Sequence, residues 1–133
     1  MSNLKSLSVL FLILSLTGCT GEPDPAKQEA ANEKSNLAKF ATCLSTSGAK
    51  FYGAEWCGHC KNQKALFQEN FQHINYIDCD KQKATCQQLE ITSYPTWILG
   101  NGKKLTGSQG LQNLAQSTGC KLVEEKPATE KPS

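Results

Sequence analysis

Arginine is missing from this chain. All 14 basic residues are lysines. With 12 acidic residues, the formal net charge is +2. Arginine is the side chain that binds phosphates and base edges in a bidentate manner, and nucleic-acid binding needs clustered positive charge. Because the lysines are scattered, we expect no nucleic-acid partner. With 133 residues, of which 38% are hydrophobic, the chain has material for one domain with a modest core.

A hydrophobic run long enough to cross a bilayer is also missing. The longest apolar stretch, residues 7–16, follows Lys5 and has the length of the h-region of a signal peptide. It ends in Leu16-Thr17-Gly18-Cys19, which resembles the lipobox of bacterial lipoproteins. The resemblance implies a lipoprotein signal peptide over residues 1–18 and an acylated Cys19 that anchors the chain to a membrane. Ordinary cleavage nearby, with Cys19 left as a spare thiol, is the alternative.

Cysteine, in contrast, is abundant, with seven residues in a short chain. Such usage is typical of an oxidising compartment or of a metal site. The export signal favours the first. We therefore expect the protein in the bacterial cell envelope, lipid-anchored and facing the periplasm or another extracytoplasmic side, with the choice of membrane left open.

Composition divides the rest of the chain into three parts. Residues 19–33 are polar and contain prolines, which predicts a flexible tether after the lipidated cysteine. Residues 123–133 are charged and have nothing to bury, which predicts a disordered tail. The folded domain is therefore expected over residues 34–122.

Hydrophobic periodicity within this domain predicts alternating helices and strands. The pattern indicates, in order, a helix around residues 37–44 that ends before Gly48, a strand at 50–54, a helix at 57–70, a strand at 74–78, a helix at 81–89, a hairpin at 96–105 that turns at Asn101-Gly102, and a helix at 109–117.

The motif with chemically reactive side chains is Trp56-Cys57-Gly58-His59-Cys60. It lies where a predicted strand ends and a predicted helix begins. Two thiols separated by two residues form a dithiol that can cycle with a disulfide. The positive end of a helix and its free backbone N–H groups stabilise a thiolate. The motif therefore predicts a redox site.

This motif, with Tyr52-Gly53-Ala54, Tyr94-Pro95-Thr96-Trp97 and the Asn101-Gly102 hairpin, resembles the thioredoxin fold over about residues 36–120. It is most similar to the thioredoxin-like domain associated with bacterial vitamin K epoxide reductase homologues, and its Cys-Gly-His-Cys site also resembles protein disulfide isomerase domains. The resemblance implies an α/β protein with a minimal thioredoxin-like fold, in which helices flank a mixed sheet of about four strands.

The resemblance also implies partners. The vitamin K epoxide reductase homologues pass oxidising equivalents from quinone to such a domain, which makes disulfides in exported proteins. We therefore expect the thiols and disulfides of exported proteins as substrates. A membrane quinone-linked disulfide oxidase, on a separate chain, is the expected redox partner. Neither a cofactor nor a metal is expected.

Roles for the site residues follow from the same resemblance. Cys57 is the expected nucleophile and Cys60 the resolving thiol. Gly58 and His59 tune the reduction potential, since a hydrogen bond or positive charge from His59 favours the reduced form and makes the protein a stronger oxidant.

The loop residues complete the expected site. A cis Pro95 leaves the backbone of Tyr94 free to pair with an extended substrate. Trp56 shields the dithiol or contacts substrate, although simple packing explains it equally well. Phe51 stands where thioredoxins and disulfide isomerases commonly have a buried acid that helps to deprotonate the second cysteine.

The remaining cysteines suggest structural disulfides. Cys79 and Cys86 lie close enough in sequence to close a short loop, and a disulfide between them is the favoured interpretation. Cys43 and Cys120 are then left over. They belong to helices that we expect on different faces of the sheet, so their pairing stays open.

Three other functions compete with an exported oxidase or isomerase. One is a reductase for exported proteins, for example in cytochrome or metal-site maturation. Another is a zinc site of four thiolates, Cys57, Cys60, Cys79 and Cys86, although the second pair is spaced more widely than a usual zinc knuckle. The third is a tethered binding domain without activity. Covalent haem is excluded because Lys61, and not histidine, follows Cys60.

Overall fold

The computed structural model describes residues 24–123, and four short strands form its single sheet. Strand order is β2-β1-β3-β4, with β1 parallel to β2, β3 antiparallel to β1 and β4 antiparallel to β3. The bounds are β1 Lys50–Gly53, β2 Tyr76–Asp78, β3 Thr96–Ile98 and β4 Lys104–Thr106. This is the four-stranded mixed sheet that the sequence predicts.

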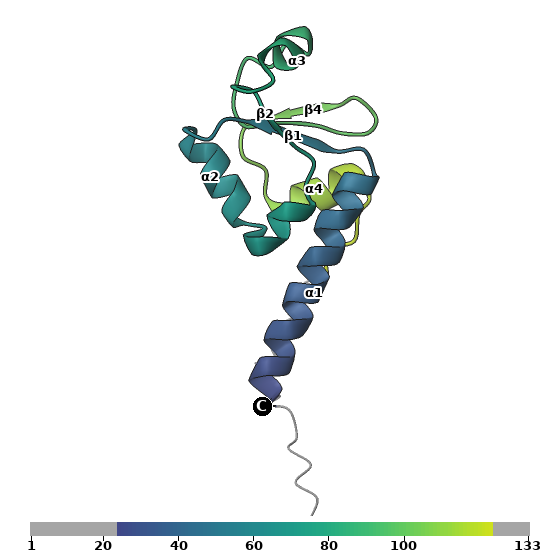
Figure 1. Cartoon of the computed structure of the whole chain (residues 1–133). Coiled ribbons are helices and arrows are strands. Elements are labelled where there is room, and N and C mark those ends of the chain that lie inside the picture. The colour runs from purple at the N-terminus through teal and green to yellow at the C-terminus, as the bar shows by residue number, and fades with distance from the viewer. Residues whose placement is uncertain (1–23, 124–133) are drawn as a thin grey trace, which may run out of the picture.

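Helices cover the two faces of this sheet unequally. They are α1 Pro25–Thr46, α2 Gly58–Ala65, the 3-10 helix η1 Gln68–His73, α3 Lys83–Gln88 and α4 Leu111–Thr118. Figure 1 shows α1, α2 and α4 on one side of the sheet and α3 on the other. The single helix predicted over 57–70 is divided into α2 and η1, because Gln68 adopts a φ of 52°, which ends regular α-helix.

The main core lies between the sheet and the three helices. Phe51 and Trp97 are cross-strand partners on β1 and β3, with ring centroids 5.0 Å apart. Phe40 of α1 stacks on Phe67, which follows α2, at 6.3 Å. Each of these four side chains is fully buried. Large aromatic groups dominate such cores, so this cluster fixes β1 and the start of α2 in one geometry.

A smaller cluster lies on the opposite face, under α3. It forms around Tyr52, Cys79 and Cys86. Successive side chains of a strand point to opposite faces, so Phe51 and Tyr52 belong to different cores.

Helix α1 begins earlier than the sequence predicts. The predicted flexible tether runs to residue 33, whereas the structure is helical from Pro25, with an Asp24 side chain that accepts a hydrogen bond from the Ala26 N–H at 3.2 Å. Proline suits the first turn of a helix, and the alanine, lysine and glutamate residues that follow are good helix formers. The first buried residue is Leu37, so the preceding turns project from the domain (Figure 1).

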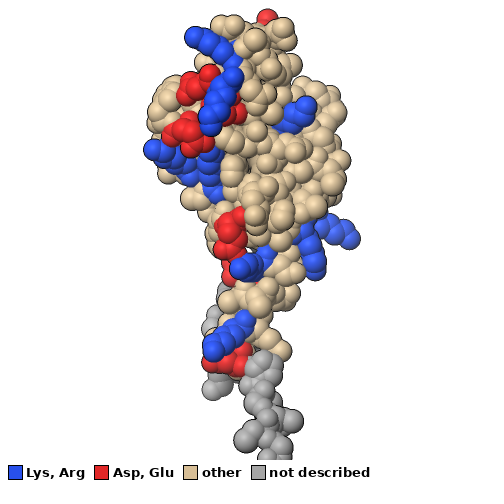
Figure 2. All heavy atoms as spheres, in the orientation of Figure 1, with Lys and Arg blue, Asp and Glu red and all other residues tan. Residues whose placement is uncertain are grey.

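Several predictions fall outside the described residues: the signal peptide over 1–18, the acylated Cys19 and nearly all of the predicted tail. Within 24–123, no helix has both the length and the apolar character needed to cross a membrane. On the visible face in Figure 2, acidic and basic side chains gather together on the left, whereas lysines alone stand on the right.

Candidate active site

The dithiol follows strand β1 in the chain and lies at the N-terminus of α2. Cys57 is the N-cap residue of α2 in an extended conformation, and its Sγ accepts a hydrogen bond from the Cys60 N–H at 3.1 Å. The thiol thus occupies the position where oxygen side chains normally satisfy free helical N–H groups. The backbone of α2 therefore directs an N–H group at the Cys57 sulfur.

The two thiols differ in access to solvent. Cys57 keeps 6% of its surface exposed, whereas Cys60 has none. Both are free cysteines. Gly53 makes this burial possible, because a Cβ at Gly53 would lie only 2.8 Å from the Cys60 Sγ. A side chain at the end of β1 would therefore displace the second thiol.

A cleft opens beside the more accessible thiol. Its volume is about 410 Å³, and Trp56, Cys57, Gly58, His59, Thr92, Ser93 and Tyr94 line it. Trp56 is 68% exposed, and its ring meets that of Tyr94 edge-on at 6.0 Å. The structure therefore brings Trp56, Gly58, His59 and Tyr94 together around Cys57, while Cys60 lies behind it.

The loop that closes this cleft ends in Pro95. The Tyr94-Pro95 peptide bond is cis, as the sequence predicts, and Pro95 is buried. The Thr96 hydroxyl donates a hydrogen bond to the Ser93 carbonyl at 2.8 Å and holds the loop in a tight turn. Sequence reasoning missed Thr92 and Ser93 as lining residues, although their position just before Tyr94 was an available signal.

A buried amide, also missed, holds α2 in place. Gln63 is fully buried, donates to the Gln109 carbonyl at 2.9 Å and accepts from the Gln109 N–H at 2.5 Å. Both bonds go to one backbone position just before α4. Nothing in the local sequence distinguishes Gln63 from a solvated helical glutamine, because its partner is 46 residues away.

The other four described cysteines are paired. Cys79 is bonded to Cys86, and Cys43 to Cys120. The second pairing corrects the expectation that α1 and α4 lie on different faces of the sheet, because both pack into the main core. Since Cys79 and Cys86 are bonded to each other, the four-thiolate zinc site with Cys57 and Cys60 is wrong.

Burial governs the ionisation of the second thiol. It raises the pKa of Cys60 to about 11, and the hydrogen bond with Cys57 adds to the effect. Phe51, fully buried on β1, provides no acid there. The arrangement combines one thiol that lines a cleft with a second that is fully buried and has a raised pKa.

Comparison with known proteins bears on this site. The family profile named Thioredoxin matches residues 34–118. The thiol-disulfide oxidoreductase LTO1 of Arabidopsis thaliana is 33% identical over 85% of this chain and 36% of its own length. Protein disulfide-isomerase 5-1 of the same plant is 29% identical over 57% of this chain and 58% of its own length. The chain thus spans less than two thirds of either relative.

A solved structure is also similar. Mitochondrial thioredoxin 3 from Saccharomyces cerevisiae, in its oxidized form, is 22% identical over 62% of this chain and 88% of its own, with a TM-score of 0.43. The family is shown by the profile, which covers well over half of the sequence and includes both free thiols. The chain belongs to the thioredoxin family, within which it matches thiol-disulfide oxidoreductases and protein disulfide-isomerases.

Proposed function

We propose that this protein is an exported, lipid-anchored thiol-disulfide oxidoreductase that oxidises or isomerises disulfides in exported proteins through Cys57 and Cys60. The observation that carries the proposal is the position of Cys57, at a helix N-terminus and in a cleft, with Cys60 buried behind it. The disulfides at Cys43–Cys120 and Cys79–Cys86 fit an oxidising compartment.

The oxidising reaction starts from the Cys57–Cys60 disulfide. A substrate thiolate attacks the Cys57 sulfur, a mixed disulfide forms, and the bond to Cys60 breaks with its electron pair on the Cys60 sulfur. A second substrate thiolate then attacks the substrate sulfur of the mixed disulfide, and Cys57 leaves as a thiolate. The substrate gains a disulfide, and the protein is left as a dithiol after protonation.

His59 supports the oxidising direction. It lies in the lining of the cleft beside Cys57, where a hydrogen bond or a positive charge stabilises the thiolate more than the disulfide. A redox pair whose reduced form is stabilised is a stronger oxidant. A reductase would use the same fold and the same two thiols but would have a lower potential.

The deciding measurement is the reduction potential of the Cys57/Cys60 couple in glutathione redox buffers. We expect a value near or above roughly −200 mV, as for disulfide isomerases and oxidases, whereas a value near roughly −270 mV would identify a reductase. A Cys60→Ser variant, which cannot form the couple, is the control. The absence of any titrating couple would refute the redox function itself.

The lipid anchor on Cys19 has a separate test. The expected result is a mature N-terminus at Cys19 that carries acyl groups, detected by mass spectrometry of protein from the membrane fraction. A Cys19→Ser variant should lose the acylation. An unmodified Cys19 in the mature protein would end this part of the proposal and leave the redox chemistry intact.

The proposed source of oxidising equivalents is a membrane quinone-linked disulfide oxidase on a separate chain. Its support is the sequence resemblance around Trp56-Cys57-Gly58-His59-Cys60. Reduced protein added to membrane vesicles should be reoxidised only when quinone is present. Reoxidation that does not depend on quinone would contradict this partner.

A further inference from the structure

The two walls of the cleft come from distant parts of the chain. One wall is the N-terminal end of α2 with Cys57 and His59, and the other is the loop at residues 92–94, which Pro95 follows. The pairing of β1 with β3 anchors the strands next to both walls. Helix α2 lies beyond the end of β1. The distance between α2 and the loop therefore depends on contacts outside the sheet.

The connection between β4 and α4 makes such contacts with both walls. We call residues 107–109 of this connection the bridging segment. The Gly107 N–H donates a hydrogen bond to the Pro95 carbonyl at 2.8 Å. The Ser108 hydroxyl donates to the His59 carbonyl at 3.3 Å. One short segment is thus bonded to the end of the loop and to the backbone of α2.

Gln63 binds the bridging segment to α2 more firmly. Its side-chain amide donates to the Gln109 carbonyl at 2.9 Å and accepts from the Gln109 N–H at 2.5 Å. The Gln63 side chain is fully buried, whereas the bond from Ser108 to His59 is exposed. A hydrogen bond shielded from water is stronger, and its loss leaves polar groups unsatisfied. Gln63 therefore makes the main polar connection between α2 and this segment.

The bridging segment is also held internally. The Gln109 side-chain amide donates to the Thr106 carbonyl at 3.1 Å and to the Gly107 carbonyl at 3.0 Å. The same amide accepts a hydrogen bond from the Asn113 side chain on α4. The segment is thereby tied to β4 and to α4, so a shift at its contact with α2 is transmitted to its contact with Pro95.

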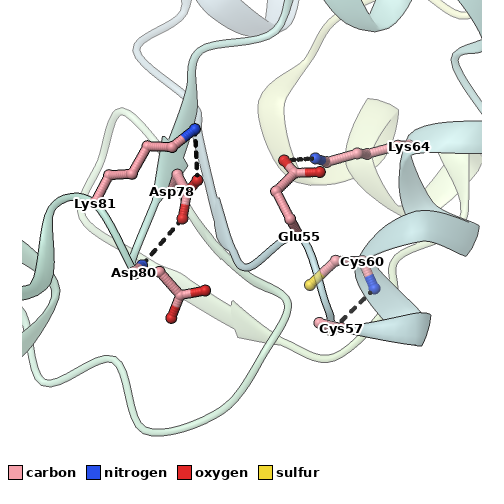
Figure 3. A network of polar contacts seen from close by, with 7 residues as sticks. All are labelled: Glu55, Cys57, Cys60, Lys64, Asp78, Asp80 and Lys81. Carbon is pink, nitrogen blue, oxygen red and sulfur yellow. Dashed lines mark hydrogen bonds and ion pairs between the residues drawn. The ribbon is translucent and has the colours of Figure 1, made fainter.

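The ion pair of α2 does not link the two walls. The Lys64 ammonium bonds the Glu55 carboxylate at 2.7 Å. Figure 3 shows Lys64 turned toward Glu55, which lies just before the dithiol on the same side of the cleft. This pair holds α2 to its own wall, whereas Gln63 reaches the segment that is bonded to the opposite wall.

We propose that Gln63, acting through the bridging segment, fixes the spacing between Cys57 and the loop before Pro95, so that an extended substrate is aligned with the Cys57 sulfur. The role rests on the proposed function. Gln63 is a positioning residue, since its bonds go to Gln109. Misplaced reacting groups lower rates strongly. A small dithiol needs only the sulfur and not the opposite wall, so the effect should depend on the size of the substrate.

The test compares two substrates of the oxidised protein: an extended peptide with two cysteines, and dithiothreitol. In both reactions the dithiol becomes a disulfide, and the Cys57–Cys60 disulfide is reduced to two thiols. Gln63→Met keeps the length of the side chain but removes both hydrogen bonds. We expect its second-order rate constant with the peptide to fall about tenfold. The rate constant with dithiothreitol should stay unchanged.

Two further variants separate positioning from general damage. Asn62→Met, the matched control, removes an exposed amide from the adjacent position of α2, and its ratio of peptide to dithiothreitol rate should equal that of the parent. The side chain introduced by Gln63→Glu can donate and accept like the amide only while protonated. Its ratio, divided by that of the parent at the same pH, should approach one at low pH and fall as the carboxyl ionises.

Several results would overturn the proposal. An unchanged peptide rate in Gln63→Met would do so, as would an equal loss with both substrates or the same selective loss in Asn62→Met. If Gln63→Met does not fold, Gln63→Glu decides, and a relative ratio that does not change with pH counts against the proposal. Failure of the redox function is distinct, because the parent itself would then not react with dithiothreitol.

Discussion

Two cysteine pairs follow the two neighbouring parallel strands, and they differ in state. Cys57 and Cys60 come after β1 and are free, whereas Cys79 and Cys86 come after β2 and form a disulfide. Burial alone does not separate the pairs, because Cys79 and Cys86 are as buried as Cys57.

The surroundings explain the difference. Cys57 caps α2 and lines a cleft, while Cys79 and Cys86 lie in the small apolar cluster beneath α3. A thiolate is the reactive form of cysteine, and it needs a helix N-terminus or a cation together with access for the partner. Under the proposed function, a helix N-terminus and a cleft, rather than the presence of two nearby thiols, distinguish Cys57 and Cys60 from Cys79 and Cys86.

The largest effect should appear when each cysteine pair is disrupted separately and the oxidoreductase activity of the two variants is compared. Cys57→Ser should reduce the oxidative refolding of a reduced test protein to the uncatalysed rate, because the accessible sulfur is lost. A Cys79→Ser/Cys86→Ser double variant, assayed well below its melting temperature, should keep most of the activity. Equal loss in both variants would show that the second pair also takes part in exchange.

The contribution of each disulfide to the free energy of unfolding should increase with the length of the loop that it closes. Loss of Cys43–Cys120, which spans 77 residues, should destabilise the oxidised protein by about 4 kcal/mol in the chain-entropy model. Loss of Cys79–Cys86, which spans 7 residues, should have an effect of about 2 kcal/mol. Urea denaturation of the two double-alanine variants measures both. A larger loss for the short loop would mean that packing under α3, not chain entropy, sets its contribution.

The smallest expected effect concerns the space around Cys60. Gly53→Ala places a methyl group 2.8 Å from the Cys60 sulfur, and overpacking of this kind should destabilise the protein by about 1–2 kcal/mol. Gly110→Ala is the control, since an added Cβ there meets no atom within 4 Å. Thermal unfolding of both variants in the reduced state compares them. The same change in melting temperature for both would show that Cys60 can move aside.

Local sequence patterns were enough to predict the order of helices and strands and the position of the dithiol. The short apolar run of β1, the Asn101-Gly102 turn and the spacing of Cys57 and Cys60 are readable from neighbouring residues, since each depends on a few consecutive side chains. The start of α1 was missed because two prolines within a polar stretch suggested a tether, although one of them occupies the first turn of the helix.

The sequence by itself determined the α/β order and the position of the two-cysteine motif, because periodicity and turn chemistry act over short distances, and its resemblance to the thioredoxin fold implied the sheet of about four strands. Tertiary structure alone decided that α1 shares a face with α4, so that Cys43 meets Cys120, and that Gln63 meets the backbone of Gln109. It also brought Lys64 to Glu55 and Tyr76. Contacts between distant residues depend on how whole elements pack, and no single segment encodes that packing.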